Sequence, residues 1–144
     1  MIRLCIAIAL ALAAVPAGAE FRSLAEAAVL YDAPSAKAKK LYVASRGTPL
    51  DVITFDAGWA KVRDASGELT WVERKSLSEA RTVVVSAPVA DVRTQPADAA
   101  PLAFQAQSGV VLELVEAGAS GWVRVRHRDG TAGFARIGQL WGVQ

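Results

Sequence analysis

Apolar and polar residues alternate along short segments of the chain with a period of two. Residues 59–63 show the pattern, with Ala60 and Val62 on one side and Trp59, Lys61 and Arg63 on the other. This period is typical of β-strands that bury one face. The turn sequences DASG and HRDG separate such segments, and their glycines supply the positive φ of tight turns. No convincing amphipathic helix follows residue 20, so the pattern predicts an all-β fold of short strands, a small barrel or sandwich.

The alternating pattern occurs twice. GWAKVRDASGELTWVERKSL (58–77) and GWVRVRHRDGTAGFARIGQL (121–140) share six of twenty residues at an offset of 63, and Pro34 matches Pro96 at an offset of 62. Two units of about sixty residues are therefore expected, over residues 20–79 and 80–144. The apolar run Thr82–Val85 between them predicts a strand and two units packed together, because a free linker would not be apolar.

Residues 1–19 have the character of a signal peptide. A basic residue, Arg3, precedes an apolar run of about a dozen residues, and Ala17-Gly18-Ala19 has the small-x-small pattern of a cleavage site. The run is too short to span a bilayer of about 30 Å. We therefore expect cleavage near Ala19-Glu20, a periplasmic or secreted protein, and no stable membrane insertion afterwards. Cleavage also removes Cys5, the only cysteine.

The net charge and the scarcity of histidine and cysteine argue against several classes of function. Of the 16 basic residues one, Arg3, lies in the signal segment, which leaves 15 against 14 acidic residues. A nearly neutral balance argues against a nucleic-acid partner. The single histidine, His127, has no cysteine or second histidine to complete a metal site, so no metal or cofactor is expected. Catalytic Cys–His or Ser–His–Asp groupings are not indicated either, and the sequence predicts a protein that is not an enzyme.

The ordered set of motifs resembles the bacterial SH3 (SH3b) domain family. The second unit carries DVRTQP, SGVVLELVE and GWVRVRHRDGTAGFARIGQLWG, and the first carries VLYDAP, RGTPLDVITF and GWAKVRDASGELTWVERKSL. The resemblance implies two tandem SH3-like β-barrels of about five strands each. It also implies a binding module, with cell-wall peptide or an envelope protein as partner. Ala33 replaces the second tyrosine of the ALYDY motif, which argues against a proline-rich ligand.

Candidate ligand-binding residues come from strand parity and from the first loop. Outward-facing Trp59 and Trp122, the latter beside Arg124 and Arg126, could stack on a sugar or bind a peptide carboxylate. The alternative is that the tryptophans cover the barrel ends and the cations form a solvated face. Tyr31 and Asp32 are a second candidate pair. They could bind a peptide amine, or Asp32 could serve only to start a turn.

Two functions follow from these features. The first is a non-catalytic, exported binding or adaptor protein that recognises peptidoglycan peptide in the periplasm. The alternative is a protein-interaction module that holds an envelope protein through Thr82–Val85 and Trp141, with no wall ligand. Trp141 is expected to close the second barrel or to dock on the first unit. The sequence leaves open which unit binds, and the oligomeric state.

Overall fold

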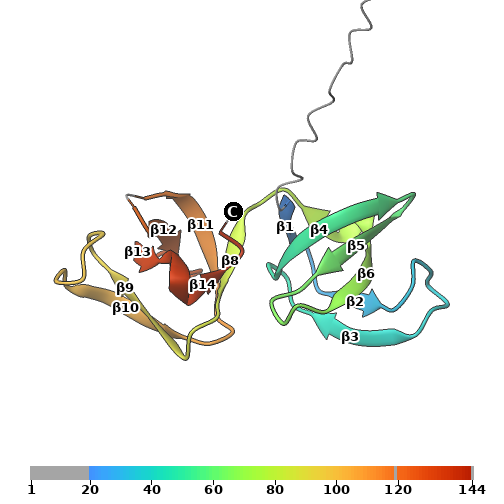
Figure 1. Ribbon diagram of the computed structural model, residues 1–144, viewed down its shortest axis with the longest axis horizontal. Coiled ribbons are helices and arrows are strands. Elements are labelled where there is room, and N and C mark those ends of the chain that lie inside the picture. The colour runs from blue at the N-terminus through green and yellow to red at the C-terminus, as the bar shows by residue number, and fades with distance from the viewer. Residues whose placement is uncertain (1–19, 119, 144) are drawn as a thin grey trace, which may run out of the picture.

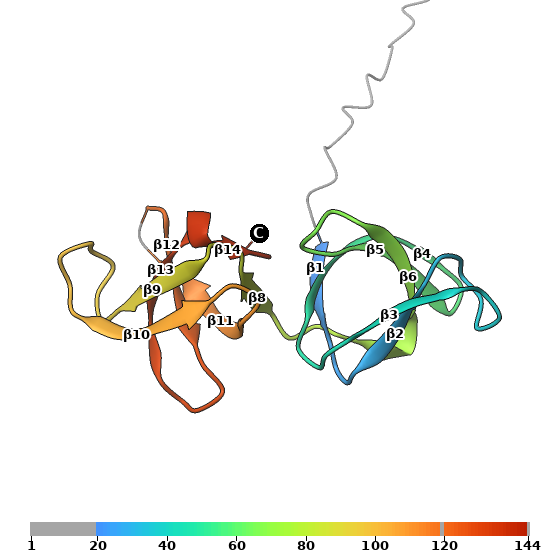
Figure 2. The same ribbon diagram turned by 90° about the horizontal axis from the view of Figure 1, so that it is seen from below.

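The structure, a computed structural model, describes residues 20–118 and 120–143. Strands form two seven-stranded antiparallel sheets, one in each unit (Figure 1). Seen from below, the sheet of the first unit curls into a ring (Figure 2). The predicted all-β architecture of two tandem SH3-like units is confirmed. The predicted signal peptide lies outside the described residues, none of which forms a helix with the length and apolar character that a membrane crossing requires.

The two units repeat the same elements in the same order. The first contains β1 (Glu20–Leu24), β2 (Ala28–Tyr31), β3 (Lys40–Ala44), β4 (Pro49–Asp56), β5 (Trp59–Arg63), β6 (Leu69–Glu73), the 3₁₀ helix η1 (Arg74–Ser76) and β7 (Leu77–Ser78). The second contains β8 (Thr82–Val85), β9 (Val89–Arg93), β10 (Leu102–Gln107), β11 (Val111–Ala117), β12 (Trp122–Arg126), β13 (Ala132–Arg136), η2 (Ile137–Gln139) and β14 (Leu140–Trp141).

The strand order is also duplicated. It runs β3-β2-β6-β5-β4-β1-β7 in the first sheet and β10-β9-β13-β12-β11-β8-β14 in the second. Each unit therefore has seven strands rather than the expected five or so. The first strand of each unit connects the short last strand to the rest of the sheet: β1 pairs with β4 and β7, and β8 pairs with β11 and β14.

Each barrel has its own apolar core, built from the inward positions of the alternating segments. In the first unit the fully buried residues include Leu24, Leu30, Leu50, Val62 and Val72, and in the second Val83, Val85, Val92, Leu112 and Val125. The run Thr82–Val85 is a strand, β8, as predicted, and its buried valines belong to the core of the second barrel. Period-two alternation thus places one apolar set inside each barrel.

The predicted glycine turns connect the strands of the β5–β6 and β12–β13 hairpins. Gly67 and Gly130 have φ of 91° and 92°, as turns of this kind require. In the first turn the carboxylate of Asp64 accepts hydrogen bonds from the backbone and hydroxyl of Ser66, and from the hydroxyl of Tyr42 on β3. Partial burial raises the pKa of Asp64, but these hydrogen bonds outweigh burial and hold the pKa below its ordinary value.

Specific contacts join the two units. Trp141 of β14 packs edge-on against Phe21 of β1, with the ring centroids 5.1 Å apart. The hydroxyl of buried Thr82 donates a hydrogen bond to the carbonyl oxygen of Gly47, at 2.6 Å. Trp141 thus docks on the first unit, which was one of the two alternatives predicted from the sequence. The prediction that the units pack together is confirmed.

We predict that the two units unfold in one cooperative transition, because they share this aromatic contact. Replacing Trp141 with alanine removes an edge-to-face pair that contributes about 0.5–1.5 kcal/mol beyond its buried area. The variant should melt at a lower temperature and show separated transitions in differential scanning calorimetry. Two well-resolved transitions in the wild type would contradict the prediction.

Candidate ligand-binding site

The structure brings two of the predicted residues together on the first unit. Tyr31 ends β2 and Trp59 begins β5, and their rings meet edge to face with centroids 5.3 Å apart and an interplanar angle of 89°. This geometry is a favourable arrangement of two aromatic quadrupoles. Tyr31 is buried and Trp59 is half-buried, so Trp59 offers the more accessible ring surface.

Strand register explains how these residues share one face. In the sheet, Tyr31 pairs with Trp71 of β6, and Trp59 pairs with Glu73 of the same strand. Trp71 and Glu73 are two residues apart, so their side chains lie on the same side of the sheet. Lys61, which pairs with Trp71, joins them. We call this set the aromatic face.

A pocket of about 240 Å³ borders the aromatic face at Tyr31. Its charged lining residues are Glu26, Glu73 and Lys75, and Lys75 lies 3.1 Å from a carboxylate oxygen of Glu73. Carboxylates therefore outnumber ammonium groups in the pocket. An acidic pocket beside aromatic rings suits a cationic group such as a peptide amine.

Asp32 lies next to Tyr31 in sequence but has a different task. Its side chain accepts a hydrogen bond from the backbone N–H of Lys39 at 3.1 Å, and its own N–H donates to the carbonyl oxygen of Lys39. The two bonds close the base of the loop between β2 and β3. Asp32 is thus a loop-closing residue, in line with the turn interpretation, and the acids at the pocket are Glu26 and Glu73.

Sequence reasoning missed the contribution of β6. Thr70 and Val72 are buried, so the same parity argument that was applied to β5 would have placed Trp71 and Glu73 outward. The DASG turn also predicts the hairpin that sets β6 beside β5. Glu26 offers no such signal, because it reaches the pocket from the irregular segment between β1 and β2.

The equivalent face of the second unit is different, and the expectation that Trp122 is exposed is wrong. Trp122 is only 6% exposed. It pairs with Arg136 of the neighbouring strand β13, whose guanidinium carbon lies 4.5 Å from the Trp122 ring centroid. Strand parity correctly places Trp122 on the outer side of the sheet. It cannot predict that Arg136 of the neighbouring strand covers the ring, because that contact depends on which strands are neighbours.

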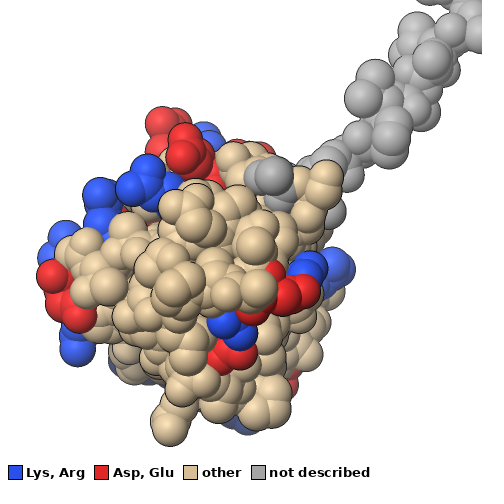
Figure 3. Space-filling model, turned by 90° about the vertical axis from the view of Figure 1, so that its left-hand side faces the viewer, with Lys and Arg blue, Asp and Glu red and all other residues tan. Residues whose placement is uncertain are grey.

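The cations of β12 are exposed as predicted, but acidic side chains neutralise them. Arg126 lies 2.7 Å from Glu113, and Arg124 lies 3.8 Å from Glu116. A β-bulge in β11 between Leu114 and Glu116 brings both acids opposite the two arginines. Arg124 and Arg126 therefore form a row of ion pairs. In the view of this end of the second unit, basic and acidic side chains likewise lie next to one another around a broad uncharged area (Figure 3).

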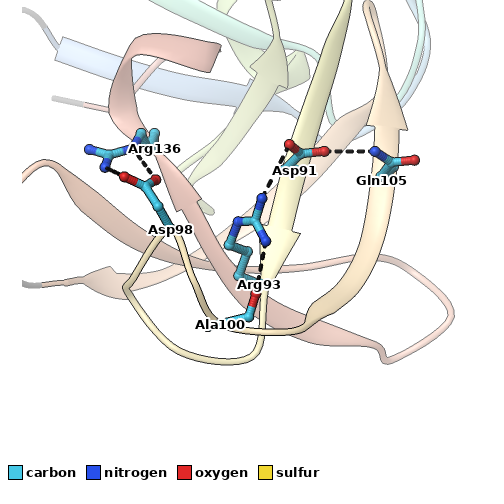
Figure 4. Close-up of polar contacts among 6 residues, drawn as sticks. All are labelled: Asp91, Arg93, Asp98, Ala100, Gln105 and Arg136. Carbon is cyan, nitrogen blue, oxygen red and sulfur yellow. Dashed lines mark hydrogen bonds and ion pairs between the residues drawn. The ribbon is translucent and has the colours of Figure 1, made fainter.

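At the position of Tyr31 the second unit has Arg93. Its guanidinium donates a hydrogen bond to the carbonyl oxygen of Ala100 at 2.8 Å and lies 3.5 Å from Asp91, which accepts a bond from Gln105 (Figure 4). The tyrosine–tryptophan pair of the first unit thus has no counterpart here. The two units present chemically different faces on the same framework.

A larger hollow, of about 1040 Å³, opens between the units. Its lining includes Arg46 of the first unit and Glu113 and Arg128 of the second. Thr82 of the predicted partner-binding run also lines it, but none of the six candidate ligand-binding residues does. Periodicity within one unit could not reveal it, because both units form its walls. Among residues 20–118 and 120–143, no group of three or more metal-ligating side chains gathers at one place.

Comparisons with solved structures give only distant likenesses. Two NlpC proteins of Trichomonas vaginalis, NlpC2 and NlpC1, each share 18% identity, with TM-scores of 0.39 and 0.40. The matches cover 86% and 85% of this chain and 48% and 45% of theirs. An NlpC/P60 family protein of Bacillus cereus ATCC 10987 shares 16% identity at a TM-score of 0.40, over 85% of this chain and 56% of its own. The chain spans about half the length of these proteins.

Comparison with protein families is more informative. No curated protein matches the chain. The family model of the bacterial SH3 domain matches it twice, over residues 25–79 and 86–142, and the two matches together cover most of the chain. They cover β2–β7 and β9–β14, and they include the motifs that resemble SH3b domains in the sequence. The chain belongs to the bacterial SH3 domain family and carries two copies of the domain in tandem.

Proposed function

We propose that this protein is an exported, non-catalytic binding protein that recognises cell-wall peptide through the aromatic face of its first domain. The observation that carries the proposal is the contact of Tyr31 with Trp59 beside an acidic pocket. Aromatic rings and a few polar groups at a concave surface are what small-ligand sites generally offer.

The chemistry of this face favours a peptide with a free amine. An ammonium group would be attracted by Glu26 and Glu73, and the adjoining peptide would pack on the exposed part of Trp59. Peptidoglycan peptide is a ligand of this kind for an exported protein. The proposed location, periplasmic or secreted, rests on the signal-peptide pattern of residues 1–19.

The alternative function is binding an envelope protein without a wall ligand. Most of the surface suggested for it is buried within the protein. Val83 and Val85 are buried in the second core, and the ring of Trp141 packs on Phe21. Thr82 is buried at the contact between the domains. A partner protein would therefore need to bind elsewhere on the molecule.

Co-sedimentation with purified cell-wall sacculi tests the proposed function. The exported form, residues 20–144, should appear in the pellet in a saturable manner, and a soluble peptide with a free amine should release it. Bovine serum albumin at the same concentration controls for trapping in the pellet. If the protein stays in the supernatant, wall binding fails, and cross-linking to envelope proteins becomes the test of the alternative function.

A further inference from the structure

The loop between β9 and β10 (residues 94–101) is fastened near its end by the hydrogen bond from Arg93 to Ala100, and near its middle by one carboxylate. Asp98, near the middle of this loop, accepts two parallel hydrogen bonds from Arg136, one of them from Nε at 3.0 Å. Arg136 in turn lies over the ring of Trp122. The paired bonds are the geometry in which a guanidinium binds any carboxylate (Figure 4).

Both guanidinium groups at this place are held in position by other contacts. The Trp122 ring supports Arg136, and Arg93 is fixed by the carbonyl oxygen of Ala100 and by Asp91. The hydrogen bond from Arg136 lowers the pKa of Asp98, and the charge of Arg93 also contributes to this shift. A carboxylate at the position of Asp98 is thus favoured directly by Arg136, which the Trp122 ring already holds in place, and at longer range by the charge of Arg93.

Asp98 itself is easy to displace. Its side chain is 73% exposed, and ion pairs in such a position contribute little to stability. A ligand carboxylate of the same geometry could take its place on Arg136 while the exposed side chain of Asp98 turns into solvent. The hydrogen bond from Arg93 to Ala100 can stay in place during this exchange.

The first domain lacks the arginine–carboxylate arrangement found in the second domain. At the offset of the repeat, Ala36 stands in the place of Asp98, Tyr31 in the place of Arg93 and Glu73 in the place of Arg136. The loop of the first domain carries Lys37 and Lys39, whereas Glu73 on the face of that domain lines an acidic pocket. The charges of loop and face are therefore reversed between the two domains.

We propose that Arg136 and Arg93 form a second binding site, which takes the carboxylate group of a ligand such as the C-terminus of a peptide, and that Asp98 occupies this site in the absence of ligand. The site is separate from the aromatic face, and its existence does not depend on the function of the first domain. A protein with both sites could hold an amine on one domain and a carboxylate on the other.

Titration of ¹⁵N-labelled protein with N-acetyl-alanyl-alanine tests the proposal, with the C-terminal amide of the same peptide as the matched ligand. The free carboxylate should shift the NMR signals of the Arg136 Nε–H and the Trp122 indole N–H, and the amide should not. Asp98→Asn removes the competing carboxylate and should tighten binding about two- to five-fold, the range that exposed ion pairs suggest. Asp129→Asn makes the same charge change away from Arg136 and should leave the affinity unchanged.

Two further variants separate a binding role from a structural one. Arg136→Gln should abolish the preference for the carboxylate over the amide. Arg136→Lys keeps the charge over Trp122 but not the paired hydrogen bonds, and should bind several-fold more weakly while the domain stays folded. Equal shifts with the two peptides, unchanged affinity in Asp98→Asn, or carboxylate-selective binding that survives in Arg136→Gln would each overturn the proposal.

Discussion

Replacing Trp59 with alanine should weaken binding to cell-wall peptide by about thirty-fold or more. The substitution removes the accessible ring of the aromatic face and leaves the Tyr31 ring without the partner whose centroid lies 5.3 Å away. Aromatic residues at the centre of a binding surface typically contribute about 2 kcal/mol or more, and every 1.4 kcal/mol is a factor of about ten in Kd. The dissociation constant can be measured from the fraction of protein bound in sacculus sedimentation over a range of wall concentrations.

The duplicated domain supplies a matched control for this substitution. Trp122 occupies the equivalent strand position but is buried beneath Arg136, so it offers a wall ligand little surface. Trp122→Phe should lower the melting temperature of the protein and leave its affinity for sacculi within about two-fold of the wild type. If Trp122→Phe impairs binding and a folded Trp59→Ala does not, the ligand-binding face has been assigned to the wrong domain.

The sequence was sufficient to predict the architecture because period-two alternation and turn chemistry are local properties. Val62 and Val125 are buried at equivalent places, and both hairpin turns have glycine at positive φ where DASG and HRDG require it. The run Thr82–Val85 could be predicted as a strand because no exposed linker would carry so apolar a segment. The last strand of each domain was not counted, because β7 and β14 are only two residues long.

The binding faces were harder to predict, because they depend on which strands are neighbours. The pairing of Tyr31 with Trp71, and of Trp59 with Glu73, follows from register in the sheet. Neutralisation of the basic row depends on a bulge in β11 that no alternation pattern marks. The burial of Trp122 depends on one side chain of β13.

Duplication has kept the cores similar and made the outer faces different. Leu30 and Val92 are both completely buried one residue before the position at which the domains diverge. That next position is Tyr31 in the first domain and Arg93 in the second. Because core positions must fill a fixed volume, they tolerate little chemical change, whereas outward positions of the same strands can change charge without unfolding the barrel. Such divergence is expected where two copies of a domain take different ligands.

Gly133→Ala should destabilise the protein by about 1–3 kcal/mol, the usual cost of forcing an extra methyl group into a packed core. Gly133 lies in β13, and a Cβ atom there would be 2.6 Å from the carbonyl oxygen of Arg93 and 2.8 Å from Cγ1 of buried Val92. The first of these neighbours is backbone at the start of the 94–101 loop, so relief of the clash should displace the loop and Arg93 with it. Urea unfolding followed by tryptophan fluorescence measures the loss of stability.

Gly138→Ala is the matched control for this clash, because a Cβ atom at Gly138 would meet nothing within 4 Å. Elsewhere a glycine-to-alanine change at a compatible backbone position stabilises by about 0.4–1 kcal/mol, since alanine has less conformational freedom to lose on folding. Gly138→Ala should therefore be neutral or slightly stabilising, with the opposite sign to Gly133→Ala. Equal stabilities for the two variants would show that β13 and β9 do not approach as closely as a Cβ-free contact at Gly133 requires.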